Sequence, residues 1–406
     1  MMLQSMRNNG NTGNEMAQQT LIYNARVYCP TGLLDPGWLL IEGRSIAAQA
    51  AGQPPETFRS PEVEQIDAAG RHLLPGFIDV HIHGALGHDF MDASLEGYHE
   101  IARFLPAHGV TSFLAATWAA PEDKIMKVLQ TVSDAYGSIP GGASQLGAYV
   151  EGPYLNPNRA GAQQTKFIHT PTDQEAILQF LNTEMVKVVV LAPEVPENLW
   201  LVDECVSRGI TVSAGHTAAT YEEMQVAVEH GLRHITHCFN AMGSMHHRKP
   251  GVIGAALTMP ELRCELIADN VHVHPAVQKI LYQAKGPYAT VLISDAIRVT
   301  GLPDGEYNLD DRTVILDKGT VRLADGTLAG SCLTLDQGLR NFADATRRPL
   351  TEIWPVVSLA PARAIGIAHQ KGVLEVGHDA DLVLLDEDLQ VAMTVVEGKI
   401  VYQAQA

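Results

Sequence analysis

Two histidines, His81 and His83, stand two residues apart at the end of the apolar run LLPGFIDVHIHG, which covers residues 73–84. Side chains alternate along a strand, so a strand here would place both imidazoles on one face together with Asp79. Imidazoles that share a face can bind a metal ion together. A solvated strand end would show the same pattern, so other residues of the chain have to distinguish the two.

Residues of the same chemical kind follow at the ends of later apolar runs. These are Glu151 in YVEGPYLN, His216 in SAGHT, His237 in HITHC, His272 in IADNVHVHP and Asp295 in LISDA. Side chains of these types act as metal ligands and general bases. A fold in which these positions served only for packing would not need such a side chain at the end of nearly every strand. The pattern therefore indicates a metal-dependent hydrolase. Strand alternation also predicts that His234 and His237 face opposite ways, so that one of them points inward.

Eight apolar runs set the spacing of these residues. They cover residues 73–80, 110–117, 146–152, 186–193, 210–215, 234–238, 264–269 and 290–295. Most are followed by a segment of helical period, such as PEDKIMKVLQTVSDAYG, so strands and helices alternate. Such units predict an α/β fold, a TIM-type (β/α)8 barrel with its active site at the C-terminal ends of the strands. A doubly wound open sheet is the alternative, but neither G-x-G-x-x-G nor a P-loop follows the first run.

Both ends of the chain are strand-rich. WLLIEGRSIAAQ near the beginning reads as two strands around a Glu-Gly turn, and VVEGKIVY near the end repeats that pattern. We expect residues 20–70 and 373–406 to form one small β-sandwich domain. Residues 71–372 then form the catalytic barrel, and residues 1–19 form a disordered tail.

Composition narrows the class of protein further. A formal net charge of −18 argues against a nucleic-acid partner, which requires a basic face. The five cysteines are odd in number and scattered, which favours a reducing compartment. No apolar run approaches the length of a membrane span, and the first 19 residues lack the apolar core of a secretory signal. We expect a cytoplasmic protein with no membrane partner.

A set of short motifs carries a family resemblance from about residue 73 to the end of the chain. The motifs are DVHIHG, VEGPYLNP, LAPE, SAGHTAAT, HCFNAM, RKPGVIG, IADNVHVHP, LISDA, LAGSCLTLDQGLRN and SLAPARAIG. Together they resemble the N-acetylglucosamine-6-phosphate deacetylases of the amidohydrolase superfamily. The resemblance implies a (β/α)8 barrel with a small β-sandwich, a phosphosugar substrate that loses its acetyl group, and a homodimer.

The resemblance assigns roles to the strand-end residues. Glu151, His216 and His237 match the family's main metal ligands, and two imidazoles with one carboxylate suit zinc, with iron as the alternative. His81 and His83 match a second metal site that some members of the superfamily have. Asp295 matches the aspartate that takes a proton from water and passes it to the departing amine.

The resemblance also implies residues that bind the substrate. Arg248, in the cationic stretch HHRKPG, and His272 match the family's phosphate ligands, and arginine can hold a phosphate through two parallel hydrogen bonds. The other expected substrate contacts are Ala162, Gln163, Asn240, Ala241, Leu328, Ala329 and Gly330.

Two positions depart from the family: Gln163 and, more mildly, Asn270, where glycine is common. Gln163 stands where the family usually has a histidine that contacts the substrate and helps to polarise the acetyl carbonyl, and glutamine cannot carry charge. Either the metal supplies most of the polarisation or the substrate differs. The alternatives are therefore a deacetylase of N-acetylgalactosamine 6-phosphate or of another N-acyl sugar phosphate, a cyclic-amide hydrolase, and a binding protein without catalysis.

Overall fold

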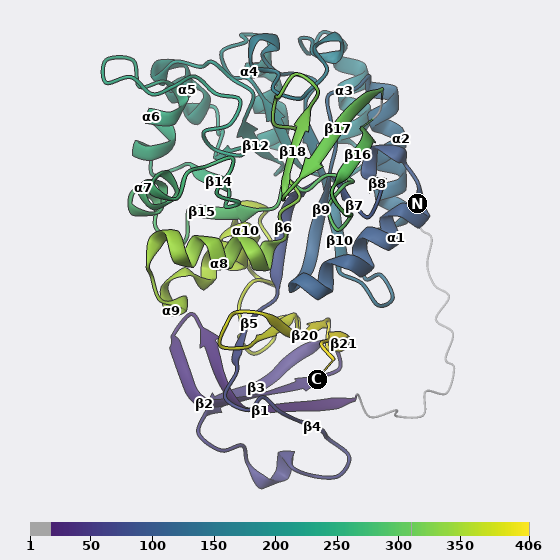
Figure 1. The fold of residues 1–406 in the computed structure, drawn as a ribbon, viewed down its shortest axis with the longest axis vertical. Coiled ribbons are helices and arrows are strands. Elements are labelled where there is room, and N and C mark those ends of the chain that lie inside the picture. The colour runs from purple at the N-terminus through teal and green to yellow at the C-terminus, as the bar shows by residue number, and fades with distance from the viewer. Residues whose placement is uncertain (1–17, 310, 406) are drawn as a thin grey trace, which may run out of the picture.

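The structure is a computed structural model that describes residues 18–309 and 311–405. The predicted tail, residues 1–19, lies outside the described residues apart from Gln18 and Gln19, and Gln19 begins the first strand. Two large sheets organise the chain, one in the upper and one in the lower part of Figure 1.

The upper sheet has eight parallel strands in the order of the sequence. They are β6 (Phe77–Ile82), β9 (Val110–Ala116), β10 (Ser144–Glu151), β11 (Val186–Leu191), β12 (Thr211–Ala214), β13 (His234–Ile235), β14 (Arg263–Ile267) and β15 (Thr290–Ile293). The two outermost strands meet where Asp295 N–H donates to the carbonyl of His81 over 2.9 Å. The predicted (β/α)8 barrel is confirmed.

Helices follow the barrel strands and cover them on the outside (Figure 1). They are α1 (Leu95–Phe104), α2 (Glu122–Asp134), α3 (Gln174–Leu181), α4 (Asn198–Ser207), α5 (Tyr221–Glu229), α6 (Gly251–Thr258), α7 (Pro275–Lys285) and α8 (Leu335–Thr346), with the short α9 (Leu350–Ile353) and α10 (Leu359–Ala364) after them. Local sequence starts several of them, as at α5, where Thr220 and Glu223 form a capping box. The barrel strands are almost wholly buried, as expected for a parallel sheet covered on both faces.

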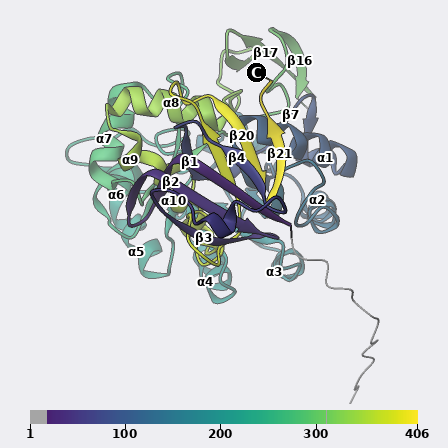
Figure 2. The ribbon, with the colours of Figure 1, turned by 90° about the horizontal axis from the view of Figure 1, so that it is seen from below.

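The lower sheet joins strands from both ends of the chain (Figure 2). Its order is β21 (Lys399–Gln403), β20 (Val391–Val396), β19 (Leu382–Leu385), β5 (His72–Pro75), β1 (Gln19–Cys29), β2 (Gly32–Glu42) and β3 (Ser45–Ala51), and β4 (Glu64–Asp67) pairs with β1. This confirms that the two ends build one separate β unit. The exact domain boundaries stay a prediction.

The predicted run 73–80 is two strands in the structure, because it passes from one sheet to the other. Gly76 lies between β5 and β6, and its N–H donates to the carbonyl of Asp381 over 2.8 Å. A Cβ atom at this position would lie 2.2 Å from Thr111 Oγ1. Only glycine fits this close approach between the lower sheet and the barrel.

A third, three-stranded sheet lies across the barrel mouth in Figure 1. It consists of β16 (Gly305–Leu309), β17 (Arg312–Asp317) and β18 (Thr320–Leu323), and a further small pair, β7 (Gly84–Ala85) and β8 (His88–Asp89), follows β6. The eight apolar runs of the sequence do not predict this three-stranded sheet. Among the described residues, no helix is long and apolar enough to cross a membrane.

A buried ionic cluster stabilises the lower sheet beneath the barrel. Lys371 Nζ lies 2.6 Å from Asp381 Oδ2 and 2.9 Å from Asp379 Oδ2, and all three side chains are almost completely buried. Burial alone would lower the pKa of Lys371, but Asp381 and Asp379 raise it above its ordinary value, so the ammonium stays charged.

We expect Lys371→Met to lower the free energy of unfolding by about 3–5 kcal/mol. The substitution leaves the buried Asp381 without its cation and leaves Asp379 with Arg44, at 3.5 Å. Urea denaturation followed by circular dichroism measures the change. Lys127→Met, at an exposed position of α2, is the matched control and should shift stability by less than about 0.5 kcal/mol. Equal stability of the two variants would contradict the role given to this cluster.

Candidate metal centre and active site

Three ligand atoms from different barrel strands converge at the C-terminal ends of the strands. Glu151 Oε1 lies 3.1 Å from His216 Nε2 and 3.0 Å from His237 Nε2, and the two Nε2 atoms lie 3.1 Å apart. The Nδ1 atom of His216 is 2.9 Å from the carbonyl oxygen of Arg159. Since that carbonyl can only accept, the Nδ1 atom carries the proton and a neutral His216 has a bare lone pair at Nε2. A carboxylate oxygen and two ring nitrogens that face one another at this spacing fit a bound cation.

The pKa of His216 shows the same preference for positive charge. Burial opposes a charged imidazole, but the hydrogen bond and charge of Glu151 raise the pKa above its ordinary value. The arrangement of two imidazoles and one carboxylate is one that zinc and iron use.

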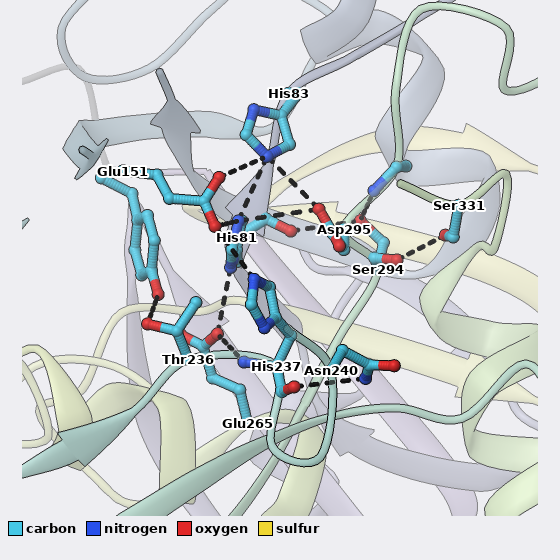
Figure 3. A network of polar contacts seen from close by, with 12 residues as sticks. His81, His83, Glu151, Thr236, His237, Asn240, Glu265, Ser294, Asp295 and Ser331 are labelled. Carbon is cyan, nitrogen blue, oxygen red and sulfur yellow. Dashed lines mark hydrogen bonds and ion pairs between the residues drawn. The ribbon is translucent and has the colours of Figure 1, made fainter. Parts of the chain in front are cut away.

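A second group shares Glu151 with the first. His81 Nε2 and His83 Nε2 lie 3.2 Å apart, and His83 Nε2 lies 3.5 Å from Glu151 Oε2 (Figure 3). Together with Glu151 they form a second set of possible metal ligands whose atoms all lie within 4.8 Å of one another. All of these side chains are buried. The structure therefore brings together the five residues for which the sequence predicts metal binding.

Asp295 lies beside the second group, directly after β15. Its Oδ1 atom is 3.3 Å from His83 Nε2 and 3.6 Å from His81 Nε2. Burial alone would raise the pKa of Asp295, but the neighbouring histidines lower it below its ordinary value, so the side chain is a carboxylate at neutral pH. Its backbone is held at φ 49°, and His216 (φ 46°) and His237 (φ 28°) are left-handed as well. Backbone strain of this kind collects at functional sites.

A cavity of about 410 Å³ opens above these residues. Its walls contain most of the predicted substrate contacts, namely Ala162, Gln163, Asn240, Ala241, His272, Leu328 and Gly330, together with His83, Glu151, His216, His237 and Asp295. Two predicted contacts lie elsewhere. Ala329 is completely buried, and Arg248 is on an exposed loop where its guanidinium contacts His247.

Four residues of the cavity wall escaped the sequence analysis: Trp118, Gly161, Arg322 and Thr327. Trp118 stacks on His83 with ring centroids 4.4 Å apart, and its indole donates to Asp89 Oδ1. It directly follows the apolar run 110–117, so its place at a strand end was a usable signal. Arg322 comes from β18, in the sheet that was not predicted, and nothing in the sequence marked it.

The side chain of Gln163 lines the cavity and is hydrogen bonded to Glu151, the metal ligand predicted for both groups. Its amide nitrogen donates to Glu151 Oε2 over 2.7 Å, and its amide oxygen accepts from the N–H of Ala119 over 2.9 Å. The side chain is buried. A neutral amide at this position orients Glu151 without adding a charge to the group.

The prediction that His234 and His237 face opposite ways stays a prediction: His237 lines the cavity, and His234 is not among the described residues that do so. Strand β13 contains His234 and ends at Ile235, so strand alternation does not extend to His237. Both residues contact the same carboxylate, Glu265, through His234 Nε2 and the backbone N–H of His237, each at 3.0 Å. Glu265 sits in the run CELIAD and escaped the sequence analysis.

A parallel barrel with two histidine–carboxylate groups at its C-terminal mouth, and the Asp295 carboxylate 3.3 Å from one of them, defines a metal-dependent hydrolase of the TIM-barrel class. The model of the amidohydrolase family matches residues 72–401. The chain belongs to the amidohydrolase family and, within it, to the family of the N-acetylglucosamine-6-phosphate deacetylases.

Individual relatives cover nearly the whole chain. The N-acetylglucosamine-6-phosphate deacetylase of Bacillus subtilis is 37% identical over 95% of this chain and 98% of its own length. The crystal structure of the Thermotoga maritima deacetylase is 34% identical, with a TM-score of 0.85 over 95% of this chain and 100% of its own. A mutant of the Mycobacterium smegmatis deacetylase, in complex with N-acetyl-D-glucosamine-6-phosphate, is 31% identical, with a TM-score of 0.87 over the same shares.

Proposed function

We propose that this chain hydrolyses the acetamide of N-acetylglucosamine 6-phosphate to glucosamine 6-phosphate and acetate. The observation that carries the proposal is the placement of the Asp295 carboxylate 3.3 Å from the second ligand group, inside a cavity that both groups line. The names of the relatives and the substrate in the Mycobacterium smegmatis complex support the choice of substrate.

Glu151, His216 and His237 would hold one divalent metal ion, and His81, His83 and the shared Glu151 would hold a second. Zinc is the ion that this ligand set suits best, with iron as the alternative. A bound ion supplies Lewis acidity, which polarises the amide carbonyl and acidifies water.

Asp295 would carry out the proton transfers of the reaction. Hydrolysis forms a bond between the water oxygen and the acetyl carbon and breaks the carbon–nitrogen bond. Asp295 takes a proton from the attacking water and delivers it to the departing nitrogen, which leaves as the amine while the acetyl group leaves as acetate. An aspartate that is ionised at neutral pH is in the correct state to begin this sequence.

The phosphate would lie at the part of the cavity lined by His272 and Arg322. His272 Nδ1 contacts Asp269 Oδ2 at 2.6 Å, which leaves Nε2 for the ligand. Arg322 also lines this cavity. Its Nη1 atom donates to the carbonyl oxygen of Gly326 over 2.8 Å, and the rest of the guanidinium would bind the anion in an otherwise acidic chain. Arg248 remains a predicted phosphate ligand, and the homodimer and the cytoplasmic location also remain predictions.

Acetate release by the purified, metal-loaded protein tests this function. We expect turnover of N-acetylglucosamine 6-phosphate to exceed that of its galactosamine epimer and of unphosphorylated N-acetylglucosamine. Preference for the epimer would instead indicate that Gln163 marks a changed substrate pocket. Hydrolysis of none of the three sugars would overturn the proposal.

Arg322→Met should raise KM for the phosphorylated sugar about 10- to 100-fold, because it removes a hydrogen bond to a charged group, which contributes about 1.5–3 kcal/mol. The low rate on the unphosphorylated sugar should not change. Lys318→Met, in the turn between β17 and β18, is the matched control, and Arg248→Met in parallel tests the other predicted ligand. Equal rates with and without the phosphate would contradict both assignments.

A further inference from the structure

A completely buried carboxylate, Glu265 of β14, lies behind the two metal-ligand groups (Figure 3). It is not among the described residues that line the cavity, so it is placed away from the substrate. An ionised side chain without solvent costs several kcal/mol unless donors satisfy it. A carboxylate kept at such a position needs a reason other than packing.

Three donors satisfy Glu265, and two of them belong to predicted metal ligands. Its Oε2 atom lies 3.0 Å from His81 Nδ1 and accepts the backbone N–H of His237 over 3.0 Å. Its Oε1 atom lies 3.0 Å from Nε2 of the buried His234. One carboxylate therefore contacts a residue from each of the two ligand groups, and His234 holds it in place.

The contact with His81 determines which nitrogen of that imidazole is free. When Nδ1–H donates to Glu265, the lone pair of the neutral ring is at Nε2. That Nε2 atom faces the metal-ligand group, 3.2 Å from His83 Nε2. Tyr149 stacks on His81 with ring centroids 4.2 Å apart, and the Tyr149 hydroxyl is hydrogen bonded to Thr236. Because Tyr149 is held in this way, it restricts rotation of the His81 imidazole.

We propose that Glu265, held by His234, is a positioning residue that fixes His81 as a ligand and makes this chain retain a second metal ion. The inference rests on the metal sites of the proposed function and adds the element that secures the second one. A carboxylate behind a ligating histidine fixes its tautomer and raises its basicity, and loss of such a partner typically costs 10- to 100-fold in metal affinity.

The primary experiment is metal content, measured by plasma mass spectrometry after dialysis against a graded series of chelator concentrations. We expect two ions per wild-type chain. Glu265→Gln should release the second ion at a chelator concentration about 10- to 100-fold lower, while the first stays bound. Asp336→Asn is the matched control, because that buried carboxylate pairs with His108 at 3.1 Å outside the metal groups, and it should retain both ions.

Two changes at His234 keep the proposal testable even if Glu265→Gln folds poorly. His234→Phe removes the donor to Glu265 and should weaken the second ion, whereas His234→Gln restores an N–H donor and should recover most of the affinity. The kinetic signature of a positioning role is a lower kcat with an unchanged KM, since neither residue touches substrate.

Because metal content is measured without substrate, the result does not depend on which sugar the enzyme hydrolyses. A single ion in the wild-type chain would overturn the proposal. Equal retention of both ions by wild type, Glu265→Gln and His234→Phe would overturn it as well and would leave Glu265 with a role in packing only.

Discussion

Asp295→Asn should lower kcat for acetate release by about 10²- to 10⁴-fold, the range expected when a general acid–base residue is lost. Asparagine has nearly the same shape but can neither take the proton from water nor deliver it to the leaving nitrogen. Asp295 Oδ1 also lies 3.3 Å from His83 Nε2, closer than Glu151 Oε2 at 3.5 Å, so the metal content of the variant has to be measured as well. Steady-state kinetics beside metal analysis therefore separates the loss of proton transfer from the loss of an ion.

The fold of this variant can be checked at the same time. Its backbone contacts, the N–H to the carbonyl of His81 and the carbonyl to the N–H of Ser331, do not use the side chain. We expect an unchanged far-ultraviolet circular dichroism spectrum and thermal midpoint. An unchanged kcat would remove Asp295 from the proposed reaction and would require another base in the cavity.

Glu151→Gln should have an effect of similar size through a different cause. Glu151 is common to both ligand groups, so one substitution weakens both sites together. Losing the Lewis acidity of the bound ions, worth several kcal/mol, corresponds to a fall in kcat/KM of about 10³-fold or more. Metal analysis of the purified variant should show that both ions are depleted.

A neighbouring carboxylate supplies the control for Glu151. Glu194 follows β11, and its oxygens accept from Asn156, Thr217 and the backbone N–H of Ala218, three residues that are not predicted metal ligands. Glu194→Gln should keep both ions. High concentrations of zinc should partly restore Glu151→Gln, because the histidines of both groups are intact. Full metal content in an inactive Glu151→Gln would contradict the ligand role and would make Glu151 a catalytic group instead.

The barrel and the ligand groups could be predicted from the sequence for a simple physical reason. Parallel strands buried on both faces are continuous apolar runs, and a ligand at the end of such a run must lie at the mouth of the barrel. His81, His83, Glu151, His216, His237 and Asp295 all follow from that rule together with the family resemblance.

The remaining parts depend on contacts between strands, which no single segment encodes. Glu265 meets His81 and His234 only because β13 and β14 pair in one particular register. Arg322 reaches the cavity from a small sheet of short strands in which polar and apolar residues are mixed, so no long apolar run predicts it. Gln163 stands out in the sequence, but its hydrogen bond to Glu151 depends on the geometry of the loop after β10.

The lower sheet has a consequence for how this protein is made on the ribosome. β5, from which the chain enters the barrel, pairs on one side with β1 and on the other with β19, which is translated only after every barrel strand. A nascent chain therefore carries an open strand edge throughout synthesis of the barrel, and such edges invite aggregation. Ribosome-bound chains that stop before β19 should accordingly be more sensitive to protease and more dependent on chaperones than the released protein.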